Sequence, residues 1–335
     1  MFGSQVRGNA AGAGRLRDRL RSGKFVVTAE IVPPVSCEAR DLIAKVEGLK
    51  GVADAVNVTD GAGARSHMGT LAAAALLIRS SVDPIMQLTC RDRNRIALQS
   101  DLLAAAAMGV ENILLLTGDD PKAGDQPDAK PVFDLDSVTL TQIAARMRDR
   151  HELMSGQRIS GTVDFFIGAA DALIDPPPGW KPLRLKAKID AGAQFVQSQF
   201  CMDAGVAARY ARCLEDNGIG GLHLLVGICP LRSARSARWM REKLHGTIIP
   251  DPVVARLEGA ADPVREGRKI CAELVEALSE NPDVAGVHIM APGNDAGLAE
   301  VVAEAARIAA RKPRRTAKPR DSQGSACGWR PGAER

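Results

Sequence analysis

The chain has 335 residues, a length that suits one large α/β barrel or two average domains. Hydrophobic residues form 45% of the chain and aromatic residues only 3%, so we expect a large aliphatic core. Residues 1–24 carry a net charge of +5 and residues 311–335 a net charge of +6, while the whole chain carries +4. The middle of the chain is therefore acidic, which disfavours a basic groove for nucleic acid.

Short β-rich runs alternate with helical stretches along the chain, which is typical of a parallel sheet. The runs that read as strands, apolar on both faces, are 25–31, 55–59, 84–88, 113–117, 165–169, 195–199, 222–228 and 286–290. The helical stretches are 37–48, 68–80, 94–108, 137–151, 181–191, 206–217, 233–244 and 264–279.

Eight strands with intervening helices favour a closed barrel over an open sheet. We therefore predict a single (β/α)8 barrel over residues 24–310. An N-terminal extension or helix at 1–23 precedes it, and a disordered basic tail at 311–335 follows it. Two long loops, 118–136 and 171–180, follow strand ends on the face where barrel enzymes place their sites.

Other sequence features limit the class of protein. None of the seven cysteines lies in a CxxC pair and no secretory signal is evident, so we expect reduced thiols in a cytoplasmic protein. No apolar run reaches the roughly 18 residues of a membrane span. The five histidines are scattered, which disfavours a metal site. Phosphate-binding loops of the GxGxxG or GxxxxGK type are absent, so a Rossmann or P-loop domain is not predicted.

Polar residues interrupt the apolar strands near their carboxyl ends. Glu30 is the most informative, because a carboxylate within a strand is costly unless it is paired or functional. It is either a salt-bridged structural residue or a general acid. The other polar residues at strand ends are Thr59, Asp60, Gln87, Thr89, Thr117, Asp119, Asp120, Gln197 and Gln199. One acid with several amides and hydroxyls favours binding of a heteroaromatic ring over metal chemistry.

These residues resemble the methylenetetrahydrofolate reductase family. The resemblance covers residues 24–308 and is carried by seven stretches in family order: AEIVPP at 29–34, VNVTD at 56–60, QLTC at 87–90, LTGDDP at 116–121, KIDAGA at 188–193, QSQF at 197–200 and VGICP at 226–230. Residues 90–101 resemble a branch of the family in which some members are fused or coupled to methyl-transfer proteins.

The resemblance implies that FAD binds in the barrel mouth, is reduced by NADH or NADPH, and reduces 5,10-methylenetetrahydrofolate to 5-methyltetrahydrofolate. Glu30 matches the general acid of the family, and Asp119 matches the catalytic aspartate beside flavin and folate. Gln199 matches the glutamine that binds the pterin. The implied flavin contacts are Thr59, Gln87, Thr117, Gly118, Asp119 and Lys188.

Three positions depart from the family pattern. Thr117 stands where well-known members have arginine, Gln87 where they have histidine, and Ala234 about where they have an aromatic residue. Two alternatives therefore stand beside the reductase. One is a folate-handling partner of a one-carbon or demethylation pathway that acts on 5-methyltetrahydrofolate in the reverse direction or with another electron donor. The other is a non-catalytic folate-binding subunit that binds a methyltransferase or an electron-transfer protein. The expected partners are the folate, NAD(P)H and either further copies of the chain or another one-carbon protein, without nucleic acid or membrane.

Overall fold

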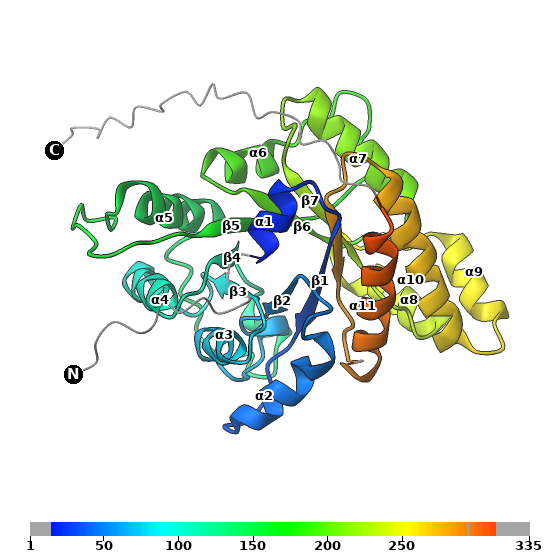
Figure 1. The fold of residues 1–335 in the computed structure, drawn as a ribbon, viewed down its shortest axis with the longest axis horizontal. Helices are drawn as coiled ribbons and strands as arrows, with labels where there is room; N and C mark the ends of the chain where they lie inside the picture. Colours follow the sequence, from blue (N-terminus) through cyan, green and yellow to red (C-terminus); the bar gives the residue numbers. More distant parts are fainter. Residues whose placement is uncertain (1–14, 294, 313–335) are drawn as a thin grey trace.

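A computed structural model of the protein describes residues 15–293 and 295–312 (Figure 1). Eight parallel strands close a barrel in sequence order, and β8 pairs with β1. The strands are β1 (Val26–Ile31), β2 (Ala55–Val58), β3 (Pro84–Thr89), β4 (Asn112–Leu116), β5 (Phe166–Asp171), β6 (Phe195–Phe200), β7 (His223–Ile228) and β8 (Gly286–Ile289). The predicted (β/α)8 barrel is confirmed, and each predicted strand agrees with an observed one to within two residues at either end.

Helices surround the barrel (Figure 1). They are α1 (Arg15–Arg21), α2 (Ala39–Val46), α3 (Thr70–Arg79), α4 (Arg95–Ala107), α5 (Ser137–Arg150), α6 (Leu183–Asp190), α7 (Ala204–Asp216), α8 (Ala234–Lys243), α9 (Asp251–Gly259), α10 (Pro263–Glu280) and α11 (Asp295–Ala310). Three short 3-10 turns are η1 (Glu47–Leu49), η2 (Ala62–Ala64) and η3 (Pro121–Ala123). Helices α9 and α11 have no counterpart among the predicted helical stretches.

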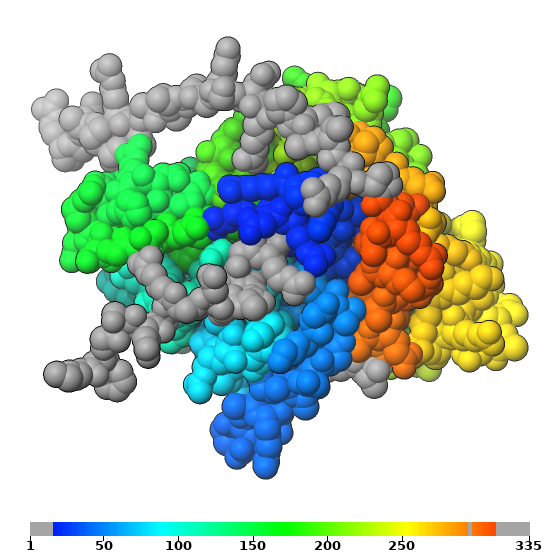
Figure 2. All heavy atoms as spheres, in the orientation of Figure 1, coloured from blue at the N-terminus to red at the C-terminus, as the bar shows by residue number. Residues whose placement is uncertain are grey.

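Helix α1 covers the amino end of the barrel. It lies across the ring in Figure 1, and its blue atoms cover the same face in Figure 2. Leu16 and Leu20 are buried in a cluster with residues at the amino ends of the strands, such as Val26 and Ile85. The backbone N–H of Leu16 also donates to the Asp83 carboxylate at 3.2 Å. With this end covered, the carboxyl end of the barrel is the face left for a ligand.

The predicted end segments are only partly described. Helix α1 falls within the predicted N-terminal segment, and residues 1–14 lie outside the described residues. Residues 313–335 of the predicted tail also lie outside them. At its described end, the chain runs past α11 to Lys312, whose Nζ lies 2.5 Å from Oε1 of Glu276 on α10. Lys312 therefore ties the end of α11 to α10.

Gly267 offers a test of how closely α10 packs against the loop after β7. Alanine normally stabilises the interior of a helix relative to glycine. At Gly267, however, an added Cβ would lie only 1.7 Å from the Leu231 carbonyl oxygen. We expect Gly267→Ala to lower the free energy of unfolding by about 1–3 kcal/mol, because backbone must move to admit the methyl group. Urea unfolding measures this. Gly259→Ala at the end of α9 is the control, since its Cβ would meet nothing within 4 Å. Equal stability of the two variants would contradict the packing described here.

Candidate active site at the carboxyl end of the barrel

A cavity of about 1000 Å3 opens at the carboxyl end of the barrel, opposite α1. Side chains from several strands, from the loops that follow them and from α6 line it. The structure brings together in this cavity all the residues predicted from the sequence for catalysis and binding, which are Glu30, Thr59, Gln87, Thr117, Gly118, Asp119, Lys188 and Gln199. Closure of the barrel places these residues around one cavity, although they are far apart in sequence.

Glu30 lies at the edge of the buried layer, with 23% of its side chain exposed. The Gln87 side chain, which comes from β3, donates from Nε2 to Oε2 of Glu30 at 2.7 Å. His288 Nε2, from β8, lies 3.6 Å from the same oxygen. Among the described residues, this histidine is the only basic side chain within ion-pair distance of Glu30. The contact with His288 is compatible with both roles considered for Glu30, a salt-bridged structural residue and a general acid.

Below Glu30, a layer of polar side chains fills the barrel interior. Asn57 and Gln197 exchange hydrogen bonds through their amides, at 2.7 and 3.0 Å. Gln197 Nε2 also lies 3.2 Å from both Thr28 Oγ1 and His288 Nδ1. Gln197 is therefore buried in a hydrogen-bonded polar layer, and it also lines the floor of the cavity that Gln199 lines. In contrast, Gln199 is only partly buried, and its Oε1 accepts from the backbone N–H of Phe200 at 3.0 Å.

The side of the cavity formed by β5 and α6 carries two half-buried charged residues, Lys188, which was predicted from the sequence, and Asp171, which was not. Asp171 lies at the end of β5, where a loop was predicted to begin, and accepts a hydrogen bond from the Tyr210 hydroxyl of α7. Burial raises the pKa of Asp171, although Tyr210 and Lys188 oppose this. Lys188 donates to the Ala170 carbonyl at 2.5 Å. Burial lowers the pKa of Lys188, and the Asp171 charge counteracts it. An ammonium group is thus held at the cavity wall.

The opposite side of the cavity is built from the loops after β2, β3 and β4. Asp60 accepts hydrogen bonds from the backbone N–H and the hydroxyl of Thr89, at 2.7 and 2.9 Å. The Arg91 guanidinium is buried against the Gly61 carbonyl and the Asp92 carboxylate, and the hydrogen bond with Asp92 raises its pKa. These contacts hold the loop ends rigidly around the cavity.

Gly118, in the loop after β4, has a backbone conformation that favours glycine. Its φ is +98°, and an added Cβ would lie 3.0 Å from Arg91 Cβ and 3.1 Å from Thr89 Cβ. Its neighbours Thr117 and Asp119 are exposed. Thr117 Oγ1 accepts from the Ser137 N–H at 3.3 Å. Thr59, by contrast, is buried at the end of β2. The cavity therefore offers both buried and exposed hydroxyl groups.

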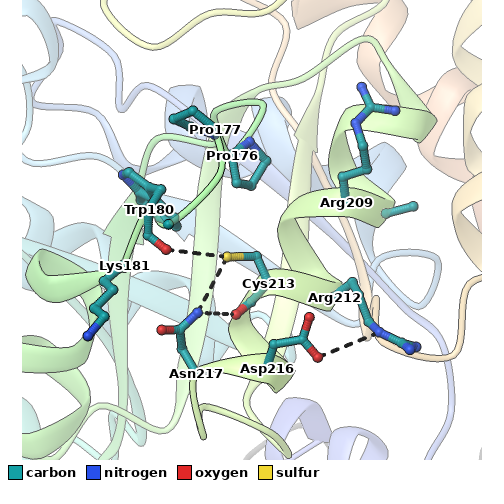
Figure 3. A pocket seen from close by; sticks show the side chains of 11 residues that line it. Pro176, Pro177, Trp180, Lys181, Arg209, Arg212, Cys213, Asp216 and Asn217 are labelled. Carbon is teal, nitrogen blue, oxygen red and sulfur yellow. Dashed lines mark hydrogen bonds and ion pairs between the residues drawn. The ribbon is translucent and has the colours of Figure 1, made fainter.

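A second, shallower pocket of about 560 Å3 lies on the outer surface, between the loop after β5 and α7 (Figure 3). Its polar groups bond mainly to one another. Cys213 Sγ lies 3.9 Å from the Trp180 carbonyl, and Asn217 Nδ2 donates to the Cys213 carbonyl at 2.9 Å. Arg212 lies 3.7 Å from Asp216. None of the predicted site residues lines this pocket.

The sequence also disfavoured a metal site and a membrane-spanning helix. Residues 15–293 and 295–312 contain no group of three or more His, Cys, Asp or Glu side chains arranged to hold a metal ion. Within the same ranges, no helix is long and apolar enough to cross a membrane.

Comparison with known proteins gives one family and a small set of relatives. The family model described as methylenetetrahydrofolate reductase matches residues 15–306. A probable methylenetetrahydrofolate reductase (NADPH) of Caenorhabditis elegans is 27% identical over 238 residues, 69% of this chain and 33% of the relative. Methylenetetrahydrofolate reductase 2 of Schizosaccharomyces pombe is 24% identical over 206 residues, 59% of this chain and 31% of the relative. The matched region is thus about a third of the length of these curated relatives.

A solved structure shares the fold. It is that of an uncharacterized protein from Clostridium thermocellum that binds two copies of 5-methyl-5,6,7,8-tetrahydrofolic acid. The TM-score is 0.61 at 14% sequence identity, and the match covers 88% of this chain and 99% of that one. At this identity the likeness concerns the fold alone.

Proposed function

The chain belongs to the methylenetetrahydrofolate reductase family, and from this we propose that it reduces 5,10-methylenetetrahydrofolate to 5-methyltetrahydrofolate with NAD(P)H and bound FAD. The observation that carries the proposal is the position of Glu30 at the cavity, with Asp119 and Gln199 lining the same space.

In this proposal Glu30 supplies the proton that opens the five-membered ring of the substrate. The Gln87 amide donates to Oε2, and no hydrogen bond to Oε1 is found within the described residues. An acidic hydrogen therefore belongs on Oε1, the oxygen that can reach the substrate. Its transfer to N10 breaks the bond between N10 and the methylene carbon and leaves an iminium at N5. That carbon then accepts hydride and becomes the methyl group.

The residues of the cavity fit a flavin dinucleotide. Its ring system needs an apolar wall with hydrogen-bond donors, and its pyrophosphate needs a cation. Leu115 and Leu116 supply an apolar wall, Thr59 a hydroxyl group, and Lys188 an ammonium group. Gly118 allows close approach of the backbone at the rim. When bound, FAD supplies the hydride for the methylene carbon, and the protein excludes water from the reacting groups.

Gln199 and Asp119 are placed to bind the folate. Gln199 Oε1 is occupied by the Phe200 N–H, so its Nε2 hydrogens are left for an acceptor on the pterin ring. Asp119 is exposed at the rim of the cavity, where its carboxylate can accept hydrogen bonds from pterin N–H groups. One amide donor and one carboxylate acceptor together match the alternating donors and acceptors of a pterin.

Binding of FAD tests the proposal at its first step. We expect FAD to bind with modest affinity, because Thr117 is a neutral hydroxyl group where a charged contact would add roughly 1.5–3 kcal/mol, about tenfold or more in Kd. Quenching of flavin fluorescence during titration with the purified protein measures the affinity. Absence of flavin binding, together with tight binding of 5-methyltetrahydrofolate, would instead support the non-catalytic folate-binding subunit.

A further inference from the structure

His288 is a buried histidine with a defined surrounding for each ring nitrogen. Only 3% of its surface is exposed. Nδ1 lies 3.0 Å from Thr28 Oγ1 and 3.2 Å from Gln197 Nε2, while Nε2 lies 3.6 Å from Glu30 Oε2. The ring therefore connects the buried polar layer to the carboxyl group at the cavity. Within the described residues, Glu30 is its only charged neighbour at ion-pair distance.

The amide pair below the ring determines which nitrogen carries the hydrogen. Gln197 Oε1 accepts from Asn57 Nδ2 at 2.7 Å, so Gln197 presents only its NH2 group to His288. Gln197 Nε2 also faces Thr28 Oγ1 and Asn57 Oδ1. An NH2 group donates and cannot accept, which favours His288 Nδ1 as an acceptor. The ring hydrogen of the neutral imidazole is then on Nε2, where it faces Glu30 Oε2.

We propose that His288 is a positioning residue for Glu30, held as the Nε2–H tautomer by Gln197 and Asn57. This rests on the proposed function. Two donors, the Gln87 amide and His288 Nε2–H, then face Oε2 of Glu30. With Oε2 committed to these donors, the acidic hydrogen resides on Oε1 and is aimed at the substrate nitrogen. The 3.6 Å separation exceeds a normal hydrogen bond, as catalytic contacts often do before the substrate binds.

Two substitutions distinguish the roles of the two ring nitrogens of His288. A glutamine side chain can place an amide N–H near the position of Nε2, whereas an asparagine side chain reaches only to the position of Nδ1. We expect His288→Gln to keep folate reduction within a few-fold of wild type and His288→Asn to slow it about 10–100-fold, the size expected for losing one hydrogen bond to the carboxylate that forms as Glu30 releases its proton. Reduction of the flavin by NAD(P)H should be unchanged in both variants, since Glu30 takes no part in that step.

Two measurements test the proposal, both on the full chain with FAD bound. Nitrogen-15 NMR of histidine-labelled protein, with His288→Gln to assign the signal, should show the Nε2–H tautomer. The Nδ1–H tautomer would mean that the amide pair is oriented the other way, and an imidazolium would remove the acceptor at Nδ1. Either result overturns the proposal.

Stopped-flow absorbance of each half-reaction is the second measurement. Equal loss of folate reduction in His288→Gln and His288→Asn, or loss of flavin reduction as well, would assign His288 a merely structural role. If the wild-type protein itself does not reduce the folate, the proposed function fails and the catalytic role of His288 fails with it. The tautomer is still decided by NMR in that case, so the two failures are distinguishable.

Discussion

Substitution of Glu30 by glutamine is expected to separate the two halves of the reaction. Flavin reduction by NAD(P)H should continue at close to the wild-type rate, because it needs no proton from Glu30. Reduction of methylenetetrahydrofolate should fall by about 10²–10⁴-fold, the range typical of losing a general acid. The substitution keeps the size of the side chain and can still accept the hydrogen bond from Gln87, so the cavity should be preserved. Stopped-flow absorbance at the flavin band measures each half alone.

Glu111→Gln provides the matched control for this variant. Glu111 is also a partly buried glutamate of the barrel, with 29% of its side chain exposed against 23% for Glu30, but it precedes β4 at the amino end. It should leave both half-reactions unchanged. Folate reduction by Glu30→Gln at a rate near that of wild type would make Glu30 a structural carboxylate. Equal loss of both halves would mean that Glu30 helps to form the flavin site.

Substitution of Lys188 by alanine is expected to give the second large effect, a loss of FAD affinity. Lys188 is half-buried beside Asp171, and its ammonium group is held by the Ala170 carbonyl at the wall of the cavity. Loss of a charged contact to the pyrophosphate should raise Kd about 10–100-fold, from roughly 1.5–3 kcal/mol for a charged hydrogen bond. Flavin fluorescence titration measures the change.

The control for Lys188 lies on the same helix. Lys186 in α6 is exposed, and its Nζ pairs with Asp190 one turn further along, at 2.5 Å. Lys186→Ala removes the same charge from the same helix without touching the cavity wall, so FAD affinity should stay within a few-fold of wild type. Equal weakening by both variants would indicate a general effect of net charge. No weakening by Lys188→Ala would remove Lys188 from the flavin site.

The barrel could be predicted from the sequence because parallel strands are buried on both faces and therefore read as short apolar runs. Every strand has this character, and the polar residues that interrupt the runs near their carboxyl ends stand out against it. Glu30, Gln87 and Gln199 were recognisable in this way, and all three line the cavity. The direction of the strands places their carboxyl ends on one face, so the grouping follows from the topology.

How deeply each polar side chain lies inside the barrel could not be predicted from the sequence. Gln197 and Gln199 are two residues apart on β6 and both line the cavity, yet Gln197 is buried in a pair with Asn57 whereas Gln199 is only partly buried. The difference depends on strand tilt and register, which stack inward side chains in layers contributed by alternate strands. The same layering brings Gln87 of β3 to Glu30 of β1, although these two strands are separated by β2.

Asp171 was missed for a different reason. An aspartate after two alanines and before a proline-rich loop resembles the start of that loop. In the structure β5 continues to Asp171, because Ala170 and Asp171 pair with Gln197 and Ser198 of β6. The stabilising partner is Tyr210, about 40 residues further along the chain, and no local pattern links the two. Helices α9 and α11 were also missed, although both have buried residues that pack against the rest of the core.

Product analysis tests the central claim most directly. FAD-loaded wild-type protein is mixed anaerobically with NADH or NADPH and 5,10-methylenetetrahydrofolate, and 5-methyltetrahydrofolate is quantified by chromatography. We predict that product forms over many turnovers and that one nicotinamide is oxidised for each methyl group formed. A protein that binds FAD and folate but forms no 5-methyltetrahydrofolate with either nicotinamide would contradict the account.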